Sequence, residues 1–208
     1  MSGYSTFVSE IADDLNRGSD FHARIRRAIN SAVQHYKGKR FTFNEARATA
    51  TSENEYLSLS FSWIEIDSVR LEDDSGFWNP LTGKSFDEIE YRSRDPNDSD
   101  EPVFYAVYGQ ALRFWPIPDR TYSFQVAYLA DFTDISLSAS DSASNAWINE
   151  GRELIRCHAM AEILEMYIDG PEALQKADRL RLREAQEFNR LKSRANRQQG
   201  SGHVECWI

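Results

Sequence analysis

The sequence predicts an α+β fold. N- and C-terminal helices form a helical bundle, an antiparallel β subdomain is inserted between them, and an extended C-terminal tail follows. Two observations predict this plan: apolar residues recur with a helical period near both ends of the chain, and with a period of two in the middle. The boundaries that follow are 1–40 plus 141–198 for the helical bundle, 41–140 for the β subdomain and 199–208 for the tail.

Two helices are predicted in the N-terminal part. The first has a short apolar stripe that ends before Gly18 and comprises Phe7, Val8, Ile11 and Leu15. The second has a longer stripe comprising Phe21, Ile25, Ala28, Ile29, Ala32, Val33 and Tyr36. Gly38 follows it at the position of a helix stop. The i, i+4, i+7 spacing predicts that this second helix buries one face.

Alternating apolar and polar residues predict half-buried strands in the middle of the chain. One run is Leu57–Trp63 and another is Tyr122–Tyr128. Between them, Val103–Tyr108 and Ala111–Trp115 flank Gly109 and Gln110, and a two-residue connection led by glycine favours a type II′ hairpin turn. Three further segments are a Pro-rich turn, a short helix and an exposed acidic loop, at Pro116–Asp119, Ser85–Arg94 and Asp95–Pro102.

Two long helices are predicted at the C-terminal end, separated by Gly170 and Pro171. The first spans Asp141–Asp169 and should be the buried centre of the fold, because its apolar stripe is broad: Trp147, Ile148, Gly151, Leu154, Ile155, Ala159, Ile163 and Met166. The second spans Glu172–Gln198. Its apolar side comprises Leu174, Ala177, Leu180, Phe188, Leu191 and Ala195, and its other side is rich in arginine.

The charge distribution argues against a protein that grips nucleic acid by neutralising phosphates. The formal net charge is −9, and residues 41–150 hold 7 Lys/Arg against 20 Asp/Glu. The two ends are mildly basic. An acidic middle repels a DNA backbone rather than holding it.

No motif for catalysis, cofactor binding or metal binding stands out, so the chain is predicted not to be an enzyme. His158 and Glu162 are one helical turn apart and could begin a metal site, but a partly buried pair is the simpler interpretation. The acidic loop lacks the spacing of a calcium site. Cys157 and Cys206 form no disulfide framework. No apolar stretch is long enough to span a membrane.

Twelve aromatic residues are concentrated in the predicted β subdomain: Trp63, Phe77, Trp78, Tyr91, Phe104, Tyr105, Tyr108, Phe114, Trp115, Tyr122, Phe124 and Tyr128. Such a cluster can line a sugar-binding face. The core of a small sheet together with an interface is the favoured interpretation, because aromatic residues are enriched in both.

Two segments are candidate interaction sites. In a ring of identical subunits the basic face of the last helix could meet the acidic middle of a neighbour, through Arg179, Arg183, Arg190 and Arg194. The simpler interpretation of this face is a solvated one. The apolar end of the tail can fold back on its own chain or dock on another chain by adding a strand, through Val204, Cys206, Trp207 and Ile208.

Several segments resemble the head-to-tail adaptor proteins of tailed phages, also called head-completion or portal-connecting proteins. Leu112–Tyr128 is similar to their strand–Pro-x-Pro-Asp–strand segment, and Asn145–Arg156 to the start of their long helix. The arginine-rich last helix followed by a short apolar tail is also similar. The overall plan resembles the family along nearly the whole chain, while the specific motifs cover residues 112–156.

The resemblance implies a ring, usually of twelve subunits, fixed beneath the portal protein. Such a ring extends the DNA channel and connects tail proteins, a nozzle or a tail tube. It also implies that the C-terminal tail reaches the portal. The chain would be made in the host cytoplasm and reside in the virion at the head–tail junction, with double-stranded DNA passing through without specific binding.

Three alternatives stay open at this point. One is another ring-forming virion part, such as a tail-tube or tail-completion protein. A second is an aromatic-faced carbohydrate-binding module or hydrolase. The third is a DNA-binding accessory protein that uses the basic last helix.

Overall fold

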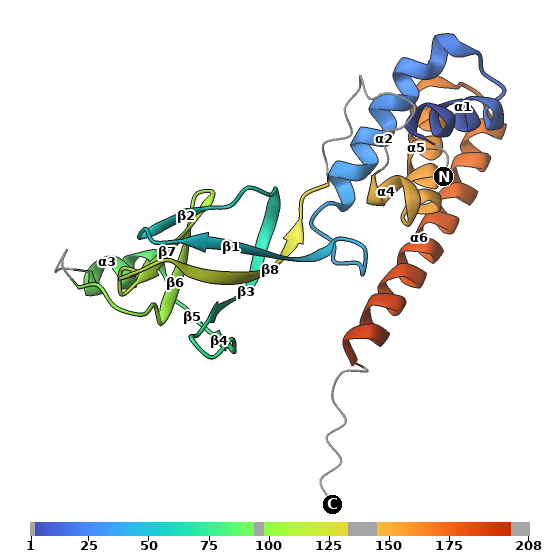
Figure 1. Ribbon diagram of the computed structural model, residues 1–208. Helices are drawn as coiled ribbons and strands as arrows, with labels where there is room; N and C mark the ends of the chain where they lie inside the picture. The colour runs from blue at the N-terminus through green and yellow to red at the C-terminus, as the bar shows by residue number, and fades with distance from the viewer. Residues whose placement is uncertain (1–2, 94–97, 133–144, 201–208) are drawn as a thin grey trace, which may run out of the picture. The chain divides into compact units, whose positions relative to one another are not determined.

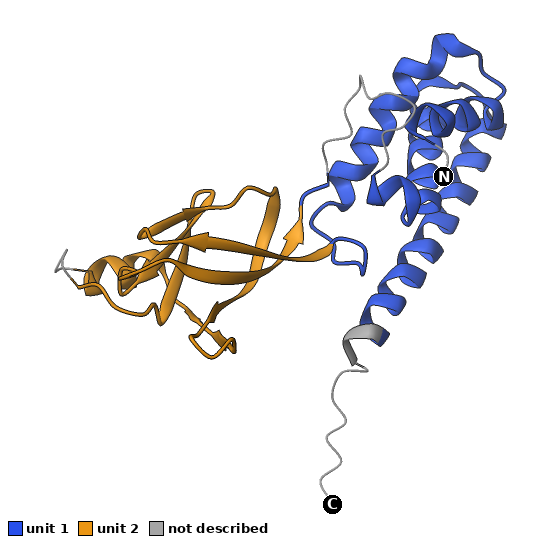
Figure 2. Ribbon diagram, viewed as in Figure 1, with its two compact units in different colours: residues 1–44, 131–208 blue, residues 45–130 orange. Residues whose placement is uncertain are grey.

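The computed structural model describes residues 3–93, 98–132 and 145–200. The chain divides into two compact units, residues 1–44 with 131–208 and residues 45–130 (Figure 2). Within the described residues, the first unit is helical and the strands lie in the second (Figure 1). The α+β class predicted from the sequence is confirmed.

The described part of the helical unit consists of three short and three long elements. The short ones are η1 (Ser19–Phe21), α4 (Ala146–Asn149) and α1 (Tyr4–Asp14). The long ones are α2 (His22–Tyr36), α5 (Arg152–Tyr167) and α6 (Pro171–Gly200). Helix α5 packs against both α2 and α6 and buries nine side chains, so it is the centre of this unit as predicted. The α1 and α2 stripes predicted from the sequence are buried in full.

The predicted continuous helix Asp141–Asp169 is wrong where it can be checked, because α4 and α5 are separate helices. Residues 141–144 lie outside the described residues. The break falls at Gly151, which is buried against Trp147. A Cβ at this glycine would lie 3.0 Å from the carbonyl oxygen of Trp147, a tight contact that would push the two apart. The close approach lets Trp147 enter the core beside Phe41 and Phe43.

Two residues placed in apolar stripes are on the surface instead. Met166 is 66% exposed near the end of α5, and Leu174 is 55% exposed in the first turns of α6. Both lie close to the connection between the helices, where Gly170 has a φ of +122° and Pro171 starts the next helix. The predicted break at these two residues is confirmed.

The β unit contains two four-stranded sheets. The first has the order β1-β8-β3-β4 and is formed by Glu45–Ser52, Tyr122–Ala130, Trp63–Glu72 and Trp78–Pro80. The second has the order β2-β7-β6-β5 and is formed by Tyr56–Ser58, Ala111–Trp115, Phe104–Tyr108 and Thr82–Gly83. All pairings are antiparallel except the two-residue β5–β6 pair. Helix α3 (Phe86–Arg92) packs on β6 and β7.

The core of the β unit lies between the inner faces of the two sheets. Phe114 of one sheet stacks on Phe124 of the other, with ring centroids 4.1 Å apart. Along β8 the residues from Tyr122 to Tyr128 alternate between buried and half-buried, as the period of two predicts. The hairpin turn is also confirmed, since Gly109 has a φ of +60° and Tyr108 pairs with Ala111.

The predicted single strand Leu57–Trp63 is wrong. Leu57 belongs to β2 in one sheet, whereas Trp63 begins β3 in the other. The intervening residues form a corner that keeps the alternation, and Phe61 stacks on Tyr128 with ring centroids 4.2 Å apart. A strand that switches sheets keeps its apolar face toward the core, so its residue pattern resembles that of one continuous strand.

Candidate interaction surfaces

A buried polar cluster joins the three long helices of the helical unit. Glu184 of α6 accepts a hydrogen bond from the Tyr36 hydroxyl of α2, and its Oε1 lies 2.6 Å from Nδ1 of His158 on α5. Arg181 donates to the other oxygen of Glu184 over 3.0 Å and also pairs with Glu165. The Glu184 side chain is only 9% exposed. The cluster therefore fixes α6 in register against its neighbours.

The sequence contains a signal for this cluster that the prediction missed. Glu184 falls in the apolar stripe of α6, between Leu180 and Phe188, where an acidic residue needs partners. The predicted His158–Glu162 pair is present but longer, with Nε2 and Oε2 3.8 Å apart. The nearer partner of His158 comes from the next helix.

The cluster shifts the acidity of its members. Burial alone would raise the pKa of Glu184, but hydrogen bonds from His158, Tyr36 and Arg181 outweigh it and lower this pKa to about 2. Burial and the hydrogen bond to Glu184 raise the pKa of the Tyr36 hydroxyl. Glu184 is therefore held as a carboxylate.

The low pKa of Glu184 predicts a pH-dependent contribution to stability. Because the folded-state pKa lies below the unfolded value, the contribution is complete above about pH 5 and disappears as the pH falls toward about 2. Urea unfolding of the native chain and of Glu184→Gln should differ most at neutral pH. The difference should shrink progressively in acid. A difference that stays constant between these pH values would contradict the assignment.

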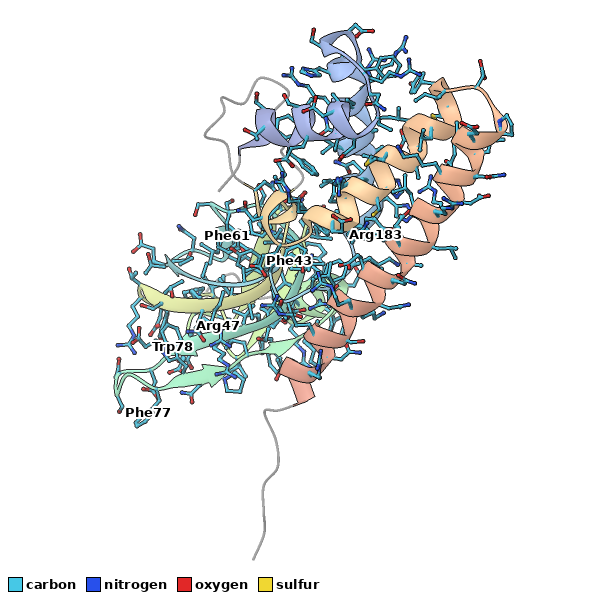
Figure 3. The ribbon with its side chains drawn as sticks, turned by 90° about the vertical axis from the view of Figure 1, so that its right-hand side faces the viewer. Phe43, Arg47, Phe61, Phe77, Trp78 and Arg183 are labelled. Atoms are coloured by element: carbon cyan, nitrogen blue, oxygen red, sulfur yellow. The ribbon has the colours of Figure 1, made fainter. Side chains whose placement is uncertain are left out.

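The four predicted interface arginines are all exposed on α6, but three of them already have carboxylate partners in the same chain. The pairs are Arg183 with Glu153, Arg190 with Glu187 and Arg194 with Glu150, at N–O distances of 3.0, 2.7 and 3.7 Å. Figure 3 shows Arg183 on this helix. Arg179 forms no ion pair with a described residue. The basic face is thus partly neutralised within the helical unit.

A groove with a cationic rim lies between the loop after α2 and α6. Its first cavity has a volume of about 270 Å³ and is lined by Gly38, Lys39, Arg40, Phe188, Lys192, Ala195 and Asn196. Every charged residue in this lining is positive. A neighbouring cavity of about 300 Å³ shares Lys39 and Phe188 and reaches Arg181 and Glu184. The two cavities are neighbours along α6, and the pair is called the groove below.

The loop that forms one wall of this groove is held by a buried asparagine. Asn44 is 0% exposed. Its side chain donates to the carbonyl oxygen of Lys39 over 2.7 Å and accepts from the amide of Phe41 over 2.8 Å. The Lys39 side chain therefore projects from a fixed backbone.

An acidic segment of the β unit is held in a similar way. The amide of Asp100 donates to the carbonyl oxygen of Ile117 over 2.9 Å, and the amide of Ile117 donates to that of Asp98 over 3.1 Å. Asp100 and Glu101 are exposed. None of the three carboxylates forms an ion pair with a described residue. The rest of the predicted acidic loop, at 95–97, lies outside the described residues.

The aromatic residues of the β unit divide into core and surface. Five of the twelve are buried: Tyr105, Phe114, Tyr122, Phe124 and Tyr128. Phe77, Tyr91 and Tyr108 are 70%, 67% and 57% exposed. These three belong to different elements, the turn before β4, α3 and the end of β6. Figure 3 shows Phe77 at the edge of the unit beside Trp78.

A buried arginine, missed in the sequence, organises one side of the second sheet. Arg113 of β7 is 4% exposed and pairs with Glu55 and Glu90. Its guanidinium lies 5.4 Å from the ring centroid of Tyr56 and 5.3 Å from that of Phe86. Since Glu90 belongs to α3, this one side chain ties the helix to the sheet.

The remaining predicted sites are outside the description or chemically inert. The tail residues Val204, Cys206, Trp207 and Ile208 lie outside the described residues. Burial, with the nearby Glu153, raises the pKa of the Cys157 thiol to about 12, so it stays protonated. In the described part, no three His, Cys, Asp or Glu side chains converge as a metal site requires. No helix there is long and apolar enough for a membrane crossing.

A protein-family model described as SU10 adaptor protein matches residues 2–205. No curated protein matches the chain.

Proposed function

Because the chain belongs to the SU10 adaptor protein family, we propose that it is a structural head-to-tail adaptor of a tailed phage. Its subunits form a ring, of twelve copies, beneath the portal protein, where the ring extends the DNA channel and connects the tail proteins. The observation that carries this proposal is the family match, which spans nearly the whole chain. Membership of a structural adaptor family points to a virion component without enzymatic activity.

The charge distribution supports the role of a conduit. A channel for duplex DNA should not hold phosphates, and the acidic middle of the chain provides repulsion rather than binding sites. The binding energy of the protein is then used for contacts with other subunits and with the portal. The exposed basic face of α6, including Arg179, is one surface available for such contacts.

The C-terminal tail is the proposed portal contact, through Val204, Cys206, Trp207 and Ile208. Deleting residues 201–208 should weaken binding to the purified portal by at least about tenfold, because apolar anchors at an interface contribute most of its affinity. Portal binding can be measured by co-sedimentation. Trp207→Ala should reproduce much of the loss, whereas His203→Ala should not. Undiminished binding of the deletion variant would eliminate this role for the tail.

Another ring-forming virion part, such as a tail-tube or tail-completion protein, makes a different prediction. An adaptor should cap the portal when the two are mixed without other tail components, and electron microscopy of the mixture detects this. A particle in which the chain binds only after other tail proteins have joined would favour the alternative.

A further inference from the structure

We propose that the groove between the Gly38–Arg40 loop and α6 binds the acidic segment Asp98–Glu101 of a second copy of the chain. This contact rests on the proposed ring and identifies the surfaces that join its subunits. Because the groove and the acidic segment are different surfaces, the contact is head-to-tail, and repeating it closes a ring when the rotation allows.

The groove contains two exposed ammonium groups that can receive a carboxylate. Lys39 and Lys192 are exposed, and neither ammonium group forms an ion pair with a described residue. The arginines on the same helix differ, since three of the four interface candidates already pair with glutamates. Adding a carboxylate beside an unpaired ammonium gains more than competing for an arginine already neutralised.

The groove also has the shape and chemistry for a peptide segment. Phe188 lines both cavities and provides an apolar floor, and Nζ of Lys192 lies 5.8 Å from its ring centroid. Asn196 adds a polar side chain for backbone groups. The wall at Lys39 is fixed by Asn44, so little conformational entropy is lost when a partner binds.

The acidic segment is the complementary surface in the β unit. Asp98, Asp100 and Glu101 are three carboxylates within four residues that form no ion pair with a described residue, and backbone hydrogen bonds to Ile117 hold their spacing. The Asp100 carboxylate accepts only the neighbouring amide of Glu101 among the described groups. Elsewhere in that unit several acidic residues are already neutralised: Glu55 and Glu90 by Arg113, Glu88 by Lys84 and Arg92, and Asp74 by Arg120. Val103 follows the segment and is 51% exposed, which gives an apolar side chain for the floor of the groove.

A reciprocal charge exchange tests this contact. The groove variant is Lys39→Glu/Lys192→Glu and the segment variant is Asp100→Lys/Glu101→Lys. Each alone should raise the dissociation constant of self-association by at least about tenfold, since two attractive pairs become repulsive. An equimolar mixture of the two variants should associate like the native chain, because each variant supplies the charges that the other needs. Sedimentation velocity over a concentration series measures this, and added salt should weaken it.

The controls separate charge complementarity from other effects. All four replaced side chains are exposed, so far-ultraviolet circular dichroism and thermal unfolding should not change. Arg17→Glu/Arg27→Glu makes the same change in net charge at exposed positions outside the groove and should leave self-association intact. Fluorescence anisotropy with a labelled DNA duplex tests the other anion available to a cationic groove.

Several outcomes would overturn the contact. The first is a native chain whose sedimentation does not depend on concentration up to about millimolar. The second is that the variants alone self-associate like the native chain, and the third is that their mixture does not recover self-association. The fourth is a groove variant that loses binding to the DNA duplex instead of self-association. Portal binding is measured separately. Normal capping of the portal by both variants would refute this contact and leave the adaptor role standing. If the mixture of the two variants recovered self-association but no form of the chain bound the portal, the contact would stand and the adaptor role would be refuted.

Discussion

Glu184→Leu is expected to lower the free energy of unfolding of the helical unit by about 3 kcal/mol, although leucine suits the apolar stripe of α6. The loss arises because three groups on three helices share this carboxylate: the Tyr36 hydroxyl, the His158 ring and the Arg181 guanidinium. Removing the acceptor leaves the buried Tyr36 hydroxyl without this partner and takes the nearest carboxylate from His158, whereas Arg181 keeps its pair with Glu165. Hydrogen exchange of amides in α2, α5 and α6 under increasing urea measures the effect.

Glu187→Ala is the matched control on the same helix. Glu187 pairs with Arg190 one turn away, at the surface, and such a pair contributes less than about 1 kcal/mol. The two variants remove the same type of group three residues apart. Equal losses would show that the buried cluster does not hold α6 in place.

Arg113→Ala is expected to destabilise the β unit by about 3 kcal/mol, at the lower end of the range for breaking a buried ion pair. The value is at the lower end because Glu55 and Glu90 are 30% and 48% exposed and can be rehydrated. The loss also includes the contacts of the guanidinium with Tyr56 and Phe86. Faster hydrogen exchange should appear in α3, β6 and β7.

Arg120→Ala provides the comparison for this variant. Arg120 pairs with Asp74 in the same unit, but the two side chains are 49% and 78% exposed. Its loss should have a much smaller effect than the loss of Arg113, because solvent screens an exposed pair. If exchange in α3 were unchanged by Arg113→Ala, the buried arginine would not be what anchors that helix. Exchange is preferred to a single melting temperature because two units need not unfold together.

The sequence predicts helices and strands well where the element has one apolar face and one polar face. Helix α2 and strand β8 are examples, since α2 buries one regular stripe and β8 alternates buried with half-buried positions from Tyr122 to Tyr128. Strand β1 was not predicted, because its sequence has no clear apolar face. It alternates alanine with arginine and threonine, and alanine carries too weak an apolar signal to reveal a strand.

The errors in the prediction come from close packing, which periodicity does not report. The helix break falls at Gly151, which lies close to Trp147, and Trp147 packs on Phe41 and Phe43 from a distant part of the sequence. Likewise Leu57 and Trp63 lie in one alternating run but in different sheets.

The candidate surfaces were predictable only as residue types. Arginines on the last helix are visible in the sequence, and so is Glu187, three residues before Arg190. The partners Glu150 and Glu153 are not, because they come from another helix or its entry. Lys39 and Lys192 are 153 positions apart in the sequence, and only the fold brings both into the lining of the groove. Unpaired charge is a property of the folded chain, so the sequence could not identify it.

The strands that begin and end the β unit are paired with each other: Glu45 of β1 lies opposite Leu129 of β8. Paired antiparallel residues have Cα atoms about 5 Å apart. The inserted residues 45–130 therefore connect the two helical segments as a tight turn would. Because the ends of the insertion are held together by this strand pair, the entropic cost of closing the connection does not grow with the length of the insertion. Evolution can lengthen, trim or exchange this module while the helical scaffold keeps the same attachment points.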